Sequence, residues 1–502
     1  MKAALRHTAV LVLVNLLAHF LPFERAMGRS HDDLAFYVTL LGLNGMSIPA
    51  FLIKEMAVPD RPLQVCVYLL QLIVGRHDVM VVTMVFLTSS LLTCAVYLLL
   101  RQLLEHPSLA FLGALVYLVL PNKLELYHTL DYANQNMVYT VYVASFFLFI
   151  IFTNTARARW LWCSLCAYTI AIFWYELGFF LPFALGAYTW WFRRKAVPYV
   201  GWFFLPALAY ALWRLDAFGL LEHSYTARPI MWRSVISNLF TMLPQHYVGR
   251  FMAKSLLYGW YRFPTIEQPW LTVIALADTA GLIALTRWIK PATLPGVPVK
   301  IVGYALFSAF VLVVPATFYW GILARHTALA SIGVAVLVVA VLSAPRTPLR
   351  LLLVALVGLS TMACQGAAWS QVVACRINQA ILYTLTEQRD DIRREECVLI
   401  DQYSFATHIP YTWVRDPHNQ LDTYWGAAAL LGRGFPFLVE LAVGGNKPVY
   451  VVRSAIELRD GQLRFKVYNG ATYQLEEQVV PSHGTILIDY EQVYGKTGFP
   501  WK

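Results

Sequence analysis

Charged residues are scarce in this chain of 502 residues: only 14% are Asp, Glu, Lys or Arg, whereas 58% are hydrophobic. So much apolar side chain cannot be hidden inside one soluble core of ordinary proportions. Apolar stretches of about 20 residues, the length that crosses a bilayer, recur from residue 8 to residue 368. The composition excludes an ordinary soluble fold and predicts an α-helical polytopic membrane protein.

Two kinds of motif are also missing. No Asn-x-Ser/Thr sequon occurs anywhere in the chain, and this absence favours a bacterial inner membrane over the endoplasmic reticulum. Of the seven cysteines, only Cys163 and Cys166 form a CxxC motif. This motif lies in an apolar segment with no second pair, which argues against a zinc site. Cys375 and Cys397 flank the start of the predicted soluble domain and could pair in an oxidising compartment.

The net charge of +10 does not point to nucleic acid, because many of the basic residues fall in short loops between apolar segments. Eleven of these segments are predicted to span the membrane. They are residues 8–23, 79–100, 107–121, 135–153, 159–175, 177–192, 198–216, 269–287, 301–319, 327–344 and 349–368.

Every second loop is basic, as expected if the N-terminus is cytoplasmic. The basic loops contain Arg101; Arg157 and Arg159; Arg193, Arg194 and Lys195; Arg287, Lys290 and Lys300; and Arg346 and Arg350. This orientation predicts external loops at residues 24–78, 122–134 and 217–268 and an external C-terminal region. Residues 34–53 and 64–75 are predicted as interfacial or re-entrant helices. If both span instead, the total becomes thirteen and the orientation is unchanged.

Residues 1–370 therefore form the predicted bundle, residues 371–395 a connector and residues 396–502 a small α+β domain on the external side. Strands are predicted at 397–400, 448–458, 462–468, 472–480 and 485–490, and a helix at 419–431. The strong turn signals Asp460-Gly461 and Asn469-Gly470 join the central strands, which predicts an antiparallel meander.

Acidic candidates lie in two of the external loops. His31, Asp32 and Asp33 directly precede an apolar segment, where partial desolvation suits a carboxylate to act as a general base. The alternative is an ordinary acidic loop or a helix N-cap. Glu125, His128 and Asp131 are spaced by three, so on one helix they would share a face as an acid-base or metal cluster. The alternative there is a solvated polar face.

Basic candidates could bind a phosphate. Arg325 and His326 lie at a late helix corner, where Arg offers a fork of donors, unless Arg325 only extends to lipid headgroups. The loop at 217–268 carries Arg228, Arg233 and Arg250, which suit a lipid phosphate or anionic headgroups in general.

Polar residues also fall within or between the apolar segments. Glu176 lies at a helix corner and Asp278 within a helix, and such carboxylates usually face the bundle interior. For Asp278 a structural pairing is the favoured role. Asn15 and His19, one turn apart, are predicted to line the interior as well.

Together these features resemble the GT-C superfamily of polytopic glycosyltransferases, which use sugar donors linked to lipid phosphate. The shared pattern is a cytoplasmic N-terminus, an acidic motif after the first helix, further acidic residues in the next external loop, an Arg-bearing late corner and a C-terminal external domain. In this chain these are His31-Asp32-Asp33, Glu125 and Asp131, residues 320–326 and residues 396–502. The resemblance covers about the first 370 residues as an architecture. The motifs that carry it are short.

The resemblance implies inverting transfer from a polyprenyl-phosphate sugar to a glycan, lipid or protein acceptor. Asp32 or Asp33 would be the base, Asp131 a further catalytic carboxylate, and Arg325 the cation facing the leaving phosphate. A divalent cation, Mg²⁺ or Mn²⁺, is compatible with this site. The chain lacks a WWD-type motif and the Asp-Glu pair of protein mannosyltransferases, which argues against protein N-glycosylation.

Three other functions are compatible with the sequence. A polymerase or ligase acting on diphosphate-linked glycans would suit the basic loop at 217–268. A transporter or flippase would place ionisable residues at mid-membrane, where only Asp278 is clearly central. A non-catalytic scaffold subunit would use the C-terminal domain for docking.

Overall fold

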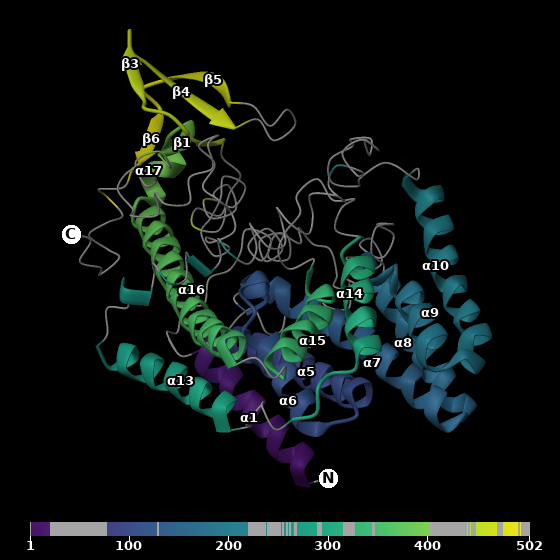
Figure 1. Ribbon diagram of the computed structural model, residues 1–502. Helices are drawn as coiled ribbons and strands as arrows, with labels where there is room; N and C mark the ends of the chain where they lie inside the picture. The colour runs from purple at the N-terminus through teal and green to yellow at the C-terminus, as the bar shows by residue number, and fades with distance from the viewer. Residues whose placement is uncertain are drawn as a thin grey trace.

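The structure is a computed structural model. It describes residues 2–20, 78–127, 130–218, 269–288, 294–314, 327–343, 347–401, 448–468 and 475–489, with residues 263–265 and a few single positions elsewhere. In Figure 1 these residues form a bundle of helices with a group of strands beyond one end. Two predicted helices, at 34–53 and 64–75, lie outside the described residues, as does the predicted helix at 419–431.

The described helices follow the apolar segments of the sequence. They are α1 (Lys2–His19), α5 (Asp78–Leu104), α6 (Pro107–Val119), η1 (Pro121–Tyr127), α7 (Leu130–Thr155), α8 (Ala158–Trp174), η2 (Glu176–Gly178), α9 (Leu181–Phe192), η3 (Arg194–Ala196), α10 (Val197–Phe218), η5 (Phe263–Thr265), α13 (Pro269–Trp288), α14 (Val299–Val313), α15 (Ala330–Leu342), α16 (Thr347–Glu387) and α17 (Arg389–Arg394). Each of the eleven predicted segments overlaps one of the α-helices; residues 21–23, 315–319 and 344 of these segments lie outside the described residues.

One helix is much longer than its predicted segment. The apolar run ends near residue 368, but α16 continues to Glu387. Residues 367–387 contain neither Pro nor Gly, so nothing in the local sequence stops the helix when its hydropathy falls. Most of the predicted connector is thus the second half of α16, followed by the short helix α17.

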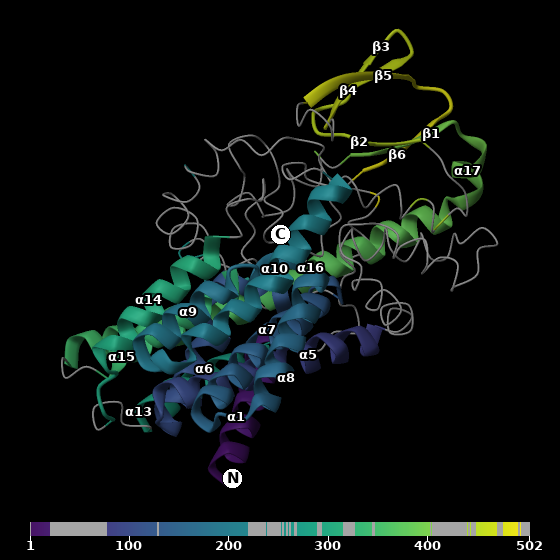
Figure 2. The same cartoon turned by 90° about the vertical axis from the view of Figure 1, so that its right-hand side faces the viewer.

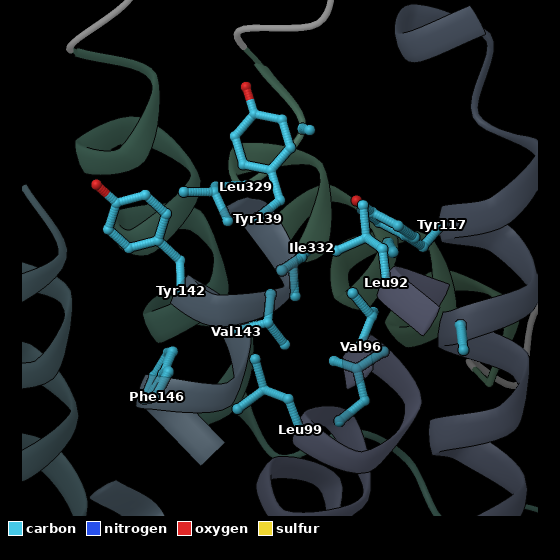
Figure 3. Close-up of a cluster of buried hydrophobic side chains, with 14 of the residues drawn as sticks. Leu92, Val96, Leu99, Tyr117, Tyr139, Tyr142, Val143, Phe146, Leu329 and Ile332 are labelled. Atoms are coloured by element: carbon cyan, nitrogen blue, oxygen red, sulfur yellow. The ribbon is translucent and has the colours of Figure 1, made fainter. Parts of the chain in front are cut away.

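The centre of the bundle is formed by α5, α6, α7 and α15, which bury a continuous apolar layer. Figure 3 shows Leu92, Val96 and Leu99 of α5 facing Val143 and Phe146 of α7. The rings of Tyr139 and Tyr142 stand at one edge of this layer, and their hydroxyl groups point away from it. The core is therefore apolar in the middle and becomes polar towards one end.

Small residues allow α14 and α15 to approach closely. A Cβ atom at Gly333 would overlap the Ala305 carbonyl oxygen and would lie 2.9 Å from the Ala309 Cβ. Small residues at helix crossings are typical of helices that pack in a membrane. Gly303 on α14 has nothing within 4 Å of the same position, so it is not part of this crossing.

Large apolar side chains also cover parts of the outside of the bundle. On α10, Leu205, Leu208 and Leu212 are each more than half exposed, and their spacing places them on one face of the helix. An apolar face of this kind is unfavourable in water but not in lipid. In the part of the chain that the structure describes, three helices are long and apolar enough to cross a membrane, at Met80–Leu104, Ala133–Thr155 and Arg194–Trp213. These features are compatible with a helical membrane protein.

Among the described residues after α17, six strands form two small sheets. They are β1 (Cys397–Ile400), β2 (Val449–Val451), β3 (Glu457–Arg459), β4 (Gln462–Tyr468), β5 (Leu475–Pro481) and β6 (Thr485–Ile488). The order β2-β1-β6 is parallel throughout, whereas β3-β4-β5 is antiparallel. Both sheets contribute to one core that contains Leu399, Val452 and Phe465.

The meander prediction is correct for only half of these strands. Asp460 and Gly461 have φ values of 53° and 72°, which is the turn expected for the β3-β4 hairpin. The predicted strand at 448–458 is instead two strands, because the chain leaves the parallel sheet at Val451 and enters the antiparallel sheet at Glu457. The predicted disulfide is wrong, since Cys397 is a free thiol whose Sγ lies 3.2 Å from the Thr485 Oγ1.

Figures 1 and 2 both show the strands beyond the C-terminal end of α16 and the N-terminus at the opposite end of the bundle. We call these the sheet end and the N-terminal end.

Candidate functional site

Uncharged polar side chains are buried towards the sheet end, where η1 meets the first residues of α15. Asn122 is fully buried and donates from Nδ2 to the Thr327 Oγ1 at 2.8 Å and to the Ser331 Oγ at 2.7 Å. Because the Ser331 hydroxyl donates its own hydrogen to the Thr327 carbonyl at 2.9 Å, it can only accept from Asn122. The amide orientation is thereby fixed, and the Asn122 Oδ1 is a buried acceptor without a hydrogen-bond partner.

Three further amides follow in the first turns of α7. Asn134, Gln135 and Asn136 are at most 4% exposed, and their side-chain oxygens have no hydrogen-bond partner. The Asn136 Nδ2 donates to the Leu126 carbonyl at 2.7 Å, and a carbonyl cannot donate, so its Oδ1 is also correctly assigned. Consecutive helical residues point about 100° apart. The three amides therefore point to different sides of the helix, and the start of α7 is rich in acceptors.

His19 and Tyr127 form the next part of this region. Their rings stack with centroids 3.6 Å apart, and the His19 Nε2 lies 3.1 Å from the Leu118 carbonyl oxygen. Burial raises the pKa of the Tyr127 phenol well above its ordinary value, and the nearby Tyr117 and Cys364 raise it further to a smaller extent. The Tyr127 hydroxyl therefore remains protonated and donates to the same carbonyl at 3.4 Å. Asn15 and His19 are fully buried, which confirms that they line the interior.

Glu176 reaches the same end of the bundle through α8 and η2. It is half-buried, and its Oε2 accepts a hydrogen bond from the Tyr210 hydroxyl at 3.4 Å. The Tyr142 hydroxyl donates to the neighbouring Tyr175 carbonyl at 2.6 Å. A Cβ atom at Gly178 would overlap the Tyr142 ring, so this corner is packed directly against α7. We call Glu176, Asn122 and the amides at 134–136 the polar end.

Of the remaining predicted site residues, the structure describes only the backbone of Glu125 and Asp131. Glu125 lies in η1 and Asp131 in the first turn of α7, so the backbone of each is adjacent to the polar end, although the structure does not describe their side chains. They belong to two different helical elements, one a 3₁₀-helix. The other predicted site residues, His31, Asp32, Asp33, His128, Arg228, Arg233, Arg250, Arg325 and His326, lie outside the described residues.

Two buried polar contacts lie away from the polar end. The Gln365 Nε2 donates to the Asp278 Oδ2 at 2.8 Å between α16 and α13, which confirms the structural pairing of Asp278. The Asn15 Nδ2 donates to the Ser89 and Ser90 hydroxyl oxygens, both at 2.9 Å. Sequence reasoning identified Asp278 and Asn15 but not their partners, which lie 74 to 87 residues away.

Among the described residues, no group of three or more His, Cys, Asp or Glu side chains is close enough to hold a metal ion. The polar end supplies neutral acceptors and one carboxylate, a set suited to hydroxyl donors. Comparison of the chain with known protein families finds no matching family model, and comparison with curated proteins finds no matching relative.

Proposed function

We propose that this protein is a membrane glycosyltransferase that moves a sugar from a polyprenyl-phosphate donor to an acceptor at the polar end. One observation carries the proposal: Asn122 and the amides at 134–136 present buried oxygens without partners, beside the backbone positions of Glu125 and Asp131. A buried acceptor without a donor costs about 1–3 kcal/mol. Sugar hydroxyl groups are donors that would remove this cost.

In this mechanism a carboxylate, Asp32 or Asp33, takes the proton of the acceptor hydroxyl. The acceptor oxygen attacks the anomeric carbon and the bond from that carbon to the phosphate oxygen breaks, so the sugar is transferred with inversion. The polyprenyl phosphate leaves with the bonding electrons, and Arg325 stabilises its charge. Asp131, His31, Glu125, His128, His326 and Glu176 would orient the two substrates, and Mg²⁺ or Mn²⁺ would fit a site with these carboxylates.

The proposal includes an arrangement in the membrane. About eleven helices span a bacterial inner membrane, the N-terminus is cytoplasmic, and the polar end and the C-terminal α+β domain face outward. Arg228, Arg233 and Arg250 would then meet the donor phosphate on the outer side. A lipid-linked donor approaches such a site from within the bilayer, which accords with the exposed apolar faces of the bundle.

The experiment is a transfer assay on the full chain in proteoliposomes with polyprenyl-monophosphate sugars. The variants Asp32→Asn, Asp33→Asn and Asp131→Asn are tested one at a time. We expect the variant that removes the acting base to lower the rate of sugar transfer by about 100-fold or more. Asp390→Asn, on the exposed surface of α17, is the matched control and should transfer normally.

Full activity of all three variants would contradict the mechanism. Consumption of diphosphate-linked oligosaccharides in place of the monophosphate donors would replace the transferase with a polymerase or ligase. Arg325→Ala should weaken donor binding; unchanged binding would move the phosphate site to the loop at 217–268.

A further inference from the structure

Two adjacent corners at the N-terminal end of the bundle carry a dense group of cations. The corner between α7 and α8 contains Arg157 and Arg159, and the corner between α9 and α10 contains Arg193, Arg194 and Lys195. All five side chains are exposed. We call these five residues the basic patch. It lies at the opposite end of the bundle from the polar end, so it has no part in the chemistry proposed there.

A direct contact fixes the two corners to one another. The Arg193 Nε and Nη2 donate to the Asn154 Oδ1 at 3.1 Å and 2.9 Å, and the Phe152 and Tyr199 rings meet edge to face at 5.0 Å. Arg193 thus has a structural role. The other four cations project from a surface whose geometry is already set.

Aromatic side chains support the cations of this surface. The Arg159 guanidinium lies 4.9 Å from the centroid of the Trp160 ring, and that of Arg194 lies 5.4 Å from the Trp190 ring. Trp162 and Trp202 pair on the adjoining faces of α8 and α10, and each is about half exposed. Exposed Trp side chains beside arginines are typical of protein surfaces that lie at a membrane–water interface.

The charge of the patch is almost all of one sign. Residues 153–162 and 188–202 contain no Asp or Glu, and the nearby carboxylate is that of Glu105, which is close enough to act on Tyr188. These two segments therefore carry five cations and no carboxylate. Among the described residues the patch makes no ion pair, so its positive charge remains for a ligand.

We propose that the basic patch binds the phosphate headgroups of anionic phospholipids in the bilayer that surrounds the protein. Phosphates accept several charge-assisted hydrogen bonds from guanidinium groups, and the indoles hold the patch at headgroup depth. The two fixed corners place the donors side by side, so that they bind the headgroup as one preorganised site.

The test uses the detergent-solubilised full chain, titrated separately with phosphatidylglycerol and phosphatidylcholine, with bound lipid counted by native mass spectrometry. The protein should retain phosphatidylglycerol preferentially. The triple variant Arg159→Gln, Arg194→Gln, Lys195→Gln should bind it about 100-fold more weakly, since each basic residue near an anionic surface contributes about fivefold.

A control variant removes the same charge elsewhere. Arg389→Gln, Arg394→Gln and Lys466→Gln change three exposed residues beyond the bundle and should leave lipid binding unchanged. An equal loss in this control, or equal retention of the two lipids by the native protein, would overturn the proposal. Competition by inorganic phosphate alone, at concentrations that match the lipid, would assign the patch to a free phosphate instead.

Discussion

At the scale of single residues, the buried amides show how much of a site depends on contacts between distant parts of the chain. The sequence indicates that Asn15, His19 and Asp278 face the interior, because polar residues in apolar helices avoid lipid. It does not indicate their partners. Asn122 bonds to Thr327 and Ser331, more than 200 residues away. Such pairs arise only when the helices pack, and helical periodicity contains no information about which helices become neighbours.

A substitution of Asn122 tests how much the buried hydrogen bonds of the polar end contribute to the stability of the protein. Asn122→Ala removes two buried hydrogen bonds, and such bonds contribute about 0.6 kcal/mol each on average between membrane helices. It also leaves a cavity at a fully buried position, whereas loss of the unpaired Oδ1 offsets part of the cost. We expect a loss of about 1 kcal/mol in the free energy of unfolding, measured by denaturant titration in mixed micelles. Lys300→Ala, an exposed change at the start of α14, should cost less than about 0.5 kcal/mol. If the two variants lose equal stability, the buried bonds to α15 contribute nothing.

At the scale of elements, hydropathy located the helices well but not all of their ends. An apolar window reports which residues suit lipid, whereas a helix ends where the backbone meets a breaker or a cap. This explains why α6 and α13 match their predicted segments closely while α16 runs on to Glu387. The parallel sheet was missed for a related reason. β1 pairs with β6, 88 residues later in the chain, whereas turn signals mark only the local connections of the antiparallel sheet, between β3 and β4 and between β4 and β5.

The crossing of α14 and α15 gives a prediction at this scale. Gly333→Ala places a methyl group against the Ala305 carbonyl oxygen and must push the helices apart, which typically costs about 1–3 kcal/mol. The melting temperature in detergent should fall. Gly303→Ala is the same change on α14, where nothing lies within 4 Å. It should be neutral or slightly stabilising, because alanine favours helix over glycine. Equal melting temperatures for both variants would contradict the close approach.

At the scale of the whole molecule, the two ends of the bundle differ in chemical character. The described residues place Arg157, Arg159, Arg193, Arg194 and Lys195 at the N-terminal end and neutral amides at the polar end. The alternation of basic loops anticipated this separation. It did not anticipate that the buried acceptors would gather in η1 and α7, because the composition of a loop does not show which of its amides become buried when the helices pack.

The orientation can be measured by labelling single cysteines in a chain whose native cysteines are replaced by alanine. Arg459→Cys in the β3-β4 hairpin should react with a membrane-impermeant maleimide added to intact cells. Lys195→Cys should react only after the membrane is permeabilised. The reverse pattern would place the N-terminus outside, and reaction of both sites in intact cells would contradict a protein that separates its two ends across a bilayer.

The continuous helix α16 also determines how far the two sheets stand from the polar end. The Cys364 Sγ lies 3.7 Å from the Val119 carbonyl oxygen, next to η1, and the helix then continues to Glu387. At 1.5 Å per residue these 23 residues span about 35 Å. A molecule that touched both the surroundings of Cys364 and the C-terminal end of α16, where the sheets begin, would need about that reach. A single sugar is far too short, whereas an extended chain of several sugars is long enough, so α16 gives the protein a minimum length for any acceptor held at both places.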